Sequence, residues 1–374
     1  MSSSQRNWRC SDTDKAANYL GLMRKAGRIA LGEHDAGAAA RAGKACLLLL
    51  AQDASDNARK RAEGFAYTAQ VPLLRLPYTK QALCERLGKT GCAIAAGDLF
   101  AEAKIPAIGT SCTNPQVTLG NDYYFRIAYI DPFQGAVMAS YALKNGCKNC
   151  VVIVEAGDDY SAGFGNYFSE AMVNGGASCD TVTFQTGETD FSTIMANIKS
   201  KGYDGIFAPV SIETAPLIIN QAREAGVECQ IMAGDTWDDI SIAERAGANA
   251  NGVFFSAFFD ASDTSNEAGV EFNKGILEWI AADATRTENN GGAADAISSV
   301  TPCGYDAYMA AYNAILAAQS TDGEAIRDAL ASLEVKGLVT GDLKFDENGD
   351  AIKNYVAIKT FQDGKIVFSA AYTG

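Results

Sequence analysis

The stretch Val151-Val-Ile-Val-Glu155 decides the fold class of this chain. A short run of apolar, mostly β-branched residues with turn residues on either side predicts a buried strand. Three similar runs follow at residues 181–184, 205–209 and 229–233, and a helical pattern separates each run from the next. Strands that alternate with helices are typical of α/β proteins whose parallel sheet is covered on both faces.

The same alternation extends in both directions from this stretch. Upstream, the pattern predicts strands at residues 106–109 and 123–128 and a helix at 131–143. Downstream, it predicts a strand at residues 253–258 and then three helices, at 266–280, 303–318 and 322–333. The last three apolar segments, at residues 341–345, 355–360 and 366–370, are joined by the turns Glu347-Asn-Gly and Gln362-Asp-Gly. Turns of this kind predict an antiparallel end to the chain.

The N-terminal part has a different pattern and a different charge. Residues 8–98 predict an αβα sandwich, with a buried strand at 45–51, a helix carrying three consecutive cations and a strand at 71–76. Residues 1–103 carry a net charge of +5, whereas residues 104–374 carry −19. Such a contrast indicates two units with different partners. The basic unit could accept RNA, and the acidic unit would repel nucleic acid.

Residues 8–98 contain Leu20-Gly-Leu-Met-Arg-Lys-Ala-Gly27 and resemble the kink-turn-binding ribosomal-protein family, in particular its bacterial members. In that family a Gly-x-Asn-Glu-x-x-Lys motif grips RNA, so the resemblance implies structured RNA as a partner. The matching positions here are Gly32, His34, Asp35 and Ala38. Only the glycine is kept, and the lost lysine removes one phosphate contact. Further RNA contacts would come from the cations Arg59, Lys60 and Arg61, which a solvated helix face explains equally well.

Longer motifs mark residues 104–374. They are Asp190-Phe-Ser-Thr-Ile-Met-Ala-Asn-Ile-Lys199, Asn220-Gln-Ala-Arg-Glu-Ala-Gly226 and Phe345-Asp-Glu-Asn-Gly-Asp350. With these motifs the segment is similar to the leucine/isoleucine/valine-binding (type 1 periplasmic) solute-binding proteins of ABC transporters. The resemblance implies a small amino-acid ligand and a transporter permease as partners. It also implies two Rossmann-like lobes, the first from about residues 104–132 and 258–340 and the second from about 133–257 and 341–374.

The resemblance implies ligand-binding residues at turns that follow strands. Ser111, Cys112 and Thr113 match the loop whose amides and hydroxyl hold the ligand carboxylate, and oriented N–H groups do form anion cradles. Asp235 matches the acid that pairs with the ligand ammonium, and Tyr160 matches an aromatic side chain from the second lobe. Two further candidates depart from the family pattern, Ser211, where some members carry tyrosine, and Trp237, two residues past Asp235.

Each of these residues also has a purely structural interpretation. The loop at Ser111 can simply cap the turn before Pro115, and Asp235 can be a surface acid in one run with Asp238 and Asp239. Tyr160 can be a packing residue at the start of a helix. Because all of them follow predicted strands, where open α/β sheets bind ligands, the functional interpretation is favoured.

The family's first lobe begins with two strand–helix units and a third strand, for which residues 104–374 have no counterpart. Two hypotheses follow. In one, residues 91–97 supply a substitute strand to a composite lobe. In the other, which we favour, the chain is a chimera with an incomplete first lobe. The first nine residues have no apolar core of a signal peptide, so we expect a cytoplasmic protein, although relatives of the C-terminal module are periplasmic or extracellular.

Catalysis is not expected from this sequence. His34 is the only histidine and lies in the first unit, so the second unit cannot assemble a Ser-His or Cys-His pair. No phosphate-binding loop is present, and we expect no cofactor. The pair Cys147-Lys-Asn-Cys150 lacks a second ligand pair and enters a strand, so no metal is expected either. Three functions remain open: solute binding for transport, RNA binding by residues 8–98, and a sensor that couples the two.

Overall fold

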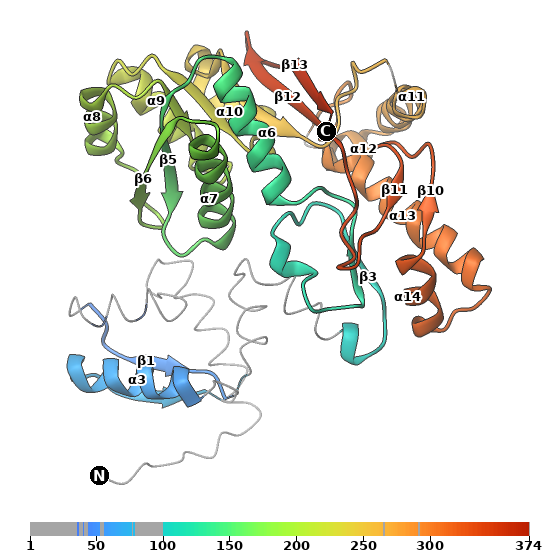
Figure 1. Ribbon diagram of the computed structural model, residues 1–374, viewed down its shortest axis with the longest axis horizontal. Helices are drawn as coiled ribbons and strands as arrows, with labels where there is room; N and C mark the ends of the chain where they lie inside the picture. Colours follow the sequence, from blue (N-terminus) through green and yellow to red (C-terminus); the bar gives the residue numbers. More distant parts are fainter. Residues whose placement is uncertain are drawn as a thin grey trace. The chain divides into compact units, whose positions relative to one another are not determined.

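The computed structural model (Figure 1) describes residues 36, 40, 44–52, 56–76, 78, 100–264, 266–290 and 292–373. The chain divides into two units, Met1–Ala96 and Gly97–Gly374. In the first unit, β1 (Leu48–Leu50) pairs in parallel with β2 (Leu73–Arg75), and α3 (Asp56–Ala69) connects them. Leu48 and Ala66 are buried between the helix and the strands, as expected for a βαβ crossover.

The second unit is built on one sheet of seven strands, in the order β13-β12-β9-β8-β7-β5-β6. Five of them are parallel: β5 (Asn149–Glu155), β6 (Ser178–Phe184), β7 (Gly205–Phe207), β8 (Gln230–Ala233) and β9 (Val253–Ala257). The last two strands are β12 (Tyr355–Gln362) and β13 (Lys365–Thr373), and β12 runs antiparallel to both β9 and β13. The predicted parallel sheet and its antiparallel edge are therefore confirmed.

Helices cover both faces of this sheet, which explains the unbroken apolar run in β5. Val152 and Val154 face α6 (Asp131–Lys144) and α7 (Asp159–Asn174). Val151 and Ile153 face the opposite side, where the other helices pack. These are α8 (Ser192–Lys201), α9 (Ala215–Glu224) and α10 (Ile240–Ala246). Successive side chains of a strand point to opposite faces, so a strand covered on both sides must be apolar throughout.

The remaining elements form two small sheets and a group of helices. β3 (Ala107–Gly109) pairs in parallel with β4 (Tyr124–Arg126), and β10 (Glu334–Val335) pairs antiparallel with β11 (Leu343–Lys344). The helices are α11 (Glu267–Ala281), α12 (Ala284–Asn289), α13 (Val300–Ala318) and α14 (Gly323–Ala331). No helix among the described residues is both long and apolar enough to cross a bilayer.

The structure corrects one predicted pairing. β11 does not join β12 in an antiparallel series but pairs with β10, and the turn at Glu347 closes only the single bridge between Phe345 and Ala351. Asp350 is held by Arg126 of β4. Residues 341–351 therefore contact β4 and β10.

Candidate functional site

Several predicted site residues lie at the carboxyl ends of the parallel strands. Tyr160 opens α7 after β5, Ser211 follows β7, and Asp235 follows β8. The strand order places β5 between β6 and β7, so the connections from β5 and β7 leave toward opposite sides of the sheet. Such a reversal is the position at which open α/β sheets bind ligands.

A hydrogen-bond network around Asp235 connects this edge to the start of α6. Asp235 Oδ1 accepts hydrogen bonds from the Gln134 amide at 2.9 Å and from the Tyr160 hydroxyl at 3.1 Å. The same Gln134 nitrogen donates to Asp131 Oδ1 at 2.9 Å. Ser256 Oγ lies 2.8 Å from Gln134 Oε1 and fixes the orientation of the amide. Gln134 therefore holds two carboxylates close to each other.

This pair of carboxylates is poorly neutralised. Burial raises the pKa of Asp131 to about 7, and the charge of Asp235 adds to the shift. Burial likewise raises the pKa of Asp235 to about 6. Among the described residues, Asp131 Oδ2 is buried without a hydrogen-bond partner. Buried acids with raised pKa values and an unused oxygen form a place that a cation would stabilise.

A buried arginine, Arg126, forms hydrogen bonds to the backbone of the loop at residues 111–113. Arg126 is fully buried, and its Nη1 donates to the carbonyl oxygens of Cys112 at 3.0 Å and Asn114 at 2.7 Å. Its Nη2 donates to Thr118 Oγ1 at 2.7 Å, and its Nε pairs with Asp350. Because the arginine occupies the loop's carbonyl oxygens, it fixes the loop's conformation.

The same loop leads directly to the acid pair. Thr113 is buried, and its carbonyl oxygen accepts a hydrogen bond from the Asp131 amide at 2.9 Å. Ser111 is exposed and Cys112 is partly exposed, so both remain accessible from solvent. A chain of hydrogen bonds therefore connects Thr113 to Asp131, Gln134, Asp235 and Tyr160.

A model of the family described as periplasmic binding protein matches residues 88–365. The chain belongs to the periplasmic binding protein family. The match begins at residue 88 rather than at 104, inside the range assigned from the sequence to the first unit.

Named relatives within this family bind branched-chain amino acids. The chain is 27% identical over 283 residues to Leu/Ile/Val-binding protein homolog 3 of Brucella melitensis, covering 74% of this chain and 72% of that protein. It is 26% identical to the leucine-specific-binding protein of Salmonella typhimurium, over 68% of this chain and 65% of that protein.

A solved structure is similar to this chain over most of its length. The fold is similar to a leucine binding protein from Thermotoga maritima, with a TM-score of 0.70, 26% identity, and coverage of 87% of this chain and 98% of that one. The unit Gly97–Gly374 makes up only about three quarters of the chain, so the match includes residues of the N-terminal unit. The expectation that the family's first strand–helix units have no counterpart here is therefore not supported.

Two predicted ligand residues of this periplasmic binding protein have structural roles. The Trp237 side chain is fully buried in the sheet's core, and its indole N–H donates to the Val210 carbonyl oxygen at 3.0 Å. It supports the turn that carries Asp235 and is too deep to contact a ligand itself. Ser211 Oγ accepts a hydrogen bond from the Thr214 amide at 3.3 Å and so closes the turn before α9.

The two further acids in the same run as Asp235 have structural roles. Asp238 is paired with the buried Lys359 of β12 at 3.3 Å and accepts a hydrogen bond from the Ser299 amide at 3.2 Å. Asp239 caps α10 by accepting from the Ser241 amide at 2.8 Å. Asp238 therefore ties β12 to the start of α13, next to the turn that carries Asp235.

Four residues of the site were missed from sequence: Asp131, Gln134, Arg126 and Asp350. Asp131 and Gln134 lie three positions apart in the first turn of α6, which places them on one face of the helix. That spacing was a usable signal. Asp350 ends the motif Phe345–Asp350, but its pairing with Arg126 could not be seen without the fold.

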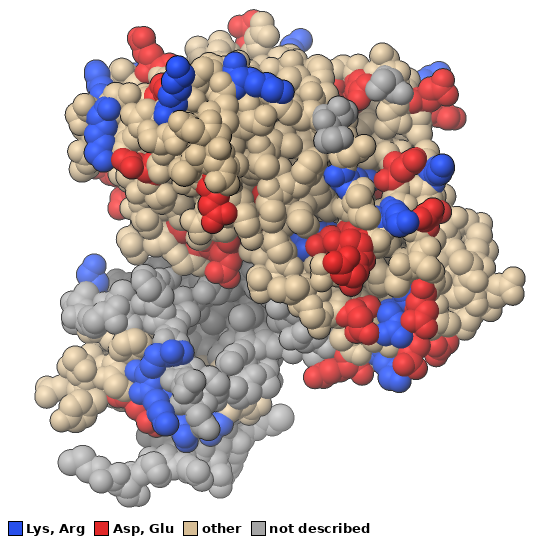
Figure 2. Space-filling model, in the orientation of Figure 1, with Lys and Arg blue, Asp and Glu red and all other residues tan. Residues whose placement is uncertain are grey.

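Only some of the positions proposed for RNA contact lie in the part of the chain that the structure describes. Gly32, His34 and Asp35 lie outside the described residues. Arg59, Lys60 and Arg61 lie on the exposed surface of α3, and Figure 2 shows basic side chains gathered over that part of the chain. RNA binding by residues 8–98 stays a prediction.

Proposed function

We propose that this chain binds a small amino acid, branched-chain or closely related, without catalysing a reaction. The observation that supports the proposal best is the pair Asp131 and Asp235, held together by Gln134 at the carboxyl edge of the sheet. Their raised pKa values and the unpartnered Asp131 oxygen favour a cationic group at this position. The α-ammonium of an amino acid is such a group.

The other end of the ligand would bind the loop at Ser111. The Arg126 contacts occupy the loop's carbonyl oxygens from one side, which leaves its hydroxyl and amide groups for a carboxylate. A zwitterion would thus place its ammonium at Asp235 and its carboxylate at Ser111 and Thr113, with the Tyr160 ring beside them. The two ends of the site come from segments on either side of α6, which is the arrangement expected of a site between two lobes.

Transport is the proposed context of this binding. The named relatives are leucine-binding and Leu/Ile/Val-binding proteins, and one similar structure is a branched-chain amino acid transporter substrate binding protein with isoleucine bound. We infer that this chain delivers its ligand to the permease of an ABC transporter. The chain spans 65% to 72% of the length of the first curated relatives, so the partner is proposed by analogy.

The test is a calorimetric titration of the full chain with L-leucine, L-isoleucine and L-valine. Two truncated ligands separate the halves of the site: 4-methylpentanoate lacks the ammonium, and 3-methylbutylamine lacks the carboxylate. We expect the complete amino acids to bind at least tenfold more tightly than either, because a charge-assisted hydrogen bond contributes about 1.5–3 kcal/mol.

Two outcomes would contradict the proposal. If no L-amino acid binds at millimolar concentration, the chain is not an amino-acid-binding protein. If 4-methylpentanoate binds as tightly as leucine, the acid pair does not receive an ammonium. D-leucine serves as the matched control, since it carries the same groups in the wrong arrangement.

A further inference from the structure

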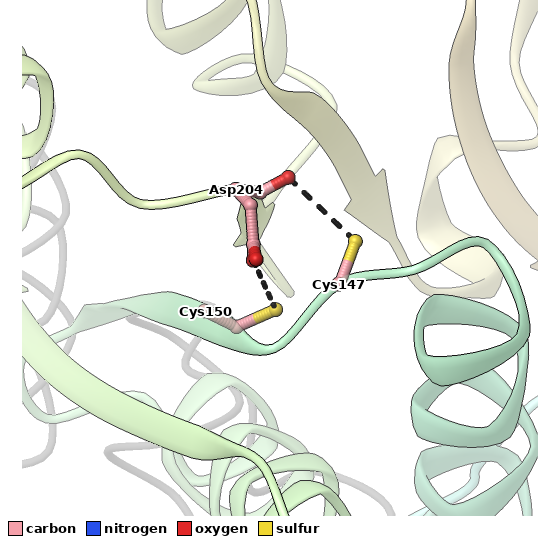
Figure 3. A group of neighbouring side chains, drawn as sticks. All are labelled: Cys147, Cys150 and Asp204. Carbon is pink, nitrogen blue, oxygen red and sulfur yellow. Dashed lines mark hydrogen bonds between the residues drawn. The ribbon is translucent and has the colours of Figure 1, made fainter.

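Two cysteines and an aspartate meet at the amino ends of β5 and β7, the edge opposite the amino-acid site (Figure 3). Cys147 follows α6, and Cys150 is the second residue of β5. Asp204 immediately precedes β7, whose first residue, Gly205, is in register with Cys150. The fold therefore adds to the Cys-x-x-Cys pair a carboxylate that lies more than fifty residues away in sequence.

The potential ligand atoms converge in a small volume. The two sulfurs and an Asp204 carboxylate oxygen all lie within 4.8 Å of one another, and Cys150 Sγ lies 3.9 Å from Asp204 Oδ1. Both sulfurs point over Gly205, where an added Cβ would lie 2.7 Å from Cys150 Sγ and 3.2 Å from Cys147 Sγ. The missing side chain at Gly205 thus leaves room for the sulfurs to approach a common point.

The carboxylate is already oriented toward the thiols. Asp204 Oδ2 accepts a hydrogen bond from the Lys148 amide at 2.7 Å, and its Oδ1 accepts one from the Asn149 amide at 2.9 Å. Outer hydrogen bonds of this kind fix first-shell ligands in metal sites. A fourth potential ligand atom is close, because Gln230 Oε1 lies 3.5 Å from Cys147 Sγ.

These separations are near those of a tetrahedral zinc site. With Zn–S near 2.3 Å and Zn–O near 2.0 Å, a tetrahedron places two sulfurs about 3.8 Å apart and a sulfur and an oxygen about 3.5 Å apart. The observed 3.9 Å between Cys150 Sγ and Asp204 Oδ1 needs a movement of only a few tenths of an ångström. Thiolate and carboxylate ligands in this geometry suit Zn²⁺ better than the hard ions Mg²⁺ or Ca²⁺.

We propose that Cys147, Cys150 and Asp204 bind one Zn²⁺ ion, with Gln230 Oε1 or a water molecule as the fourth ligand. Both cysteines bind as thiolates, so loading releases their two protons to solvent. The site joins the turn after α6 to the starts of β5 and β7 and stabilises the large sheet. Because it lies at the opposite edge from Asp235, zinc does not take part in binding the amino acid.

The simplest alternative is that the cysteines only pack in the core and that Asp204 only holds the turn. Cys147 and Cys150 are buried, at 3% and 0% exposed, which either interpretation accepts. The two interpretations differ in what they predict for a soft metal added to the reduced protein. If the cysteines only pack, the added metal should not bind stoichiometrically. A disulfide between the two cysteines would also prevent metal binding.

The experiment titrates the reduced, metal-free full chain with Co²⁺ and follows the sulfur-to-cobalt charge-transfer absorption and the visible absorption of tetrahedral cobalt. We expect both signals to saturate at one equivalent and to disappear when Zn²⁺ is added. Cys147→Ser and Cys150→Ser should abolish them, and Asp204→Asn should weaken binding at least tenfold. Cys179→Ser is the matched control, a partly buried cysteine on neighbouring β6, and should leave them unchanged.

A second measurement does not depend on how the variants fold. X-ray absorption at the zinc edge of the wild-type chain should show two sulfur and two lighter ligands. The proposal is overturned if the reduced wild-type chain gives no tetrahedral cobalt spectrum, if its spectrum survives both cysteine variants, or if the zinc has a different sulfur count.

Discussion

Replacing Asp235 with asparagine should stabilise the ligand-free chain while weakening its binding of amino acid. The pKa of Asp235 is raised from 3.8 to about 6, mainly by burial. Because this folded-state pKa lies above the unfolded one, the contribution of the group to stability is present below about pH 4 and is lost as pH rises through about 6. Two pKa units correspond to about 3 kcal/mol, which the native state loses by pH 7.5.

Asparagine removes this cost and keeps the local hydrogen bonds. Its side-chain oxygen can still accept from the Gln134 amide and the Tyr160 hydroxyl, which now approach Asp235 Oδ1 at 2.9 and 3.1 Å. We therefore expect the free energy of unfolding at pH 7.5 to rise by up to about 3 kcal/mol. The gain should shrink toward zero by pH 4, where the wild-type carboxyl is itself neutral. Affinity for leucine should fall at least tenfold, since the ammonium loses a charged partner.

The assay is urea unfolding of the ligand-free chain at pH 7.5, 6 and 4.5, followed by tryptophan fluorescence. Trp237 is fully buried beside the substituted residue and reports on the relevant unit. Asp239→Asn is the matched control, because Asp239 caps α10 and asparagine caps a helix equally well. An Asp235→Asn chain that is less stable than wild type at pH 7.5, or whose gain in stability is the same at all three pH values, would contradict this prediction.

Three further outcomes are expected. Arg126→Met should lower the free energy of unfolding by about 3–5 kcal/mol, because it leaves the buried Asp350 carboxylate without its cation. It should also abolish leucine binding, because the loop at residues 111–113 loses its contact with Arg126. Urea unfolding should show that adding Asp350→Leu restores part of the lost stability. Tyr160→Phe should weaken leucine binding about tenfold, as titration calorimetry can measure, and lower the free energy of unfolding at pH 7.5 by about 1–3 kcal/mol, because the Asp235 carboxylate loses a hydrogen-bond donor. Leucine affinity should increase from pH 5 to 7.5 with proton release near pH 6.5, because the raised pKa values of Asp131 and Asp235 must fall when an ammonium binds; a flat profile would contradict this.

Strands could be predicted from sequence wherever burial alone determines them. The runs that became β5 and β8 are apolar because helices cover both faces, and no other segment is needed to recognise them. Pairing was less predictable. The turn signal at Glu347-Asn-Gly is real, since Gly349 has a positive φ of 83°, but the chain beyond it is drawn to Arg126 instead of continuing the hairpin. A turn motif determines the local backbone conformation but not which strand the following residues pair with.

In the candidate site, too, only residues with a local signal could be predicted from sequence. Asp235 and Tyr160 could be found because each follows a recognisable strand, and position after a strand is a local property. Gln134 could not be assigned a role, because its partner Asp235 lies 101 residues away and its orientation depends on Ser256 of β9. For Trp237, position in sequence was misleading as a guide to ligand contact. Its position in sequence suggested the binding site, whereas its side chain turns into the core.

The acid pair explains why a fold would retain a costly arrangement. Two carboxylates that share one amide donor destabilise the ligand-free chain at neutral pH, and asparagine at either position would relieve the repulsion. The residue before Asp235 is closely packed, because a Cβ at Gly234 would lie 2.2 Å from Phe164 and 2.5 Å from the Tyr160 hydroxyl. An ammonium bound between these acids would relieve the repulsion, so the affinity for the proposed ligand and the electrostatic cost of the acid pair would have the same origin.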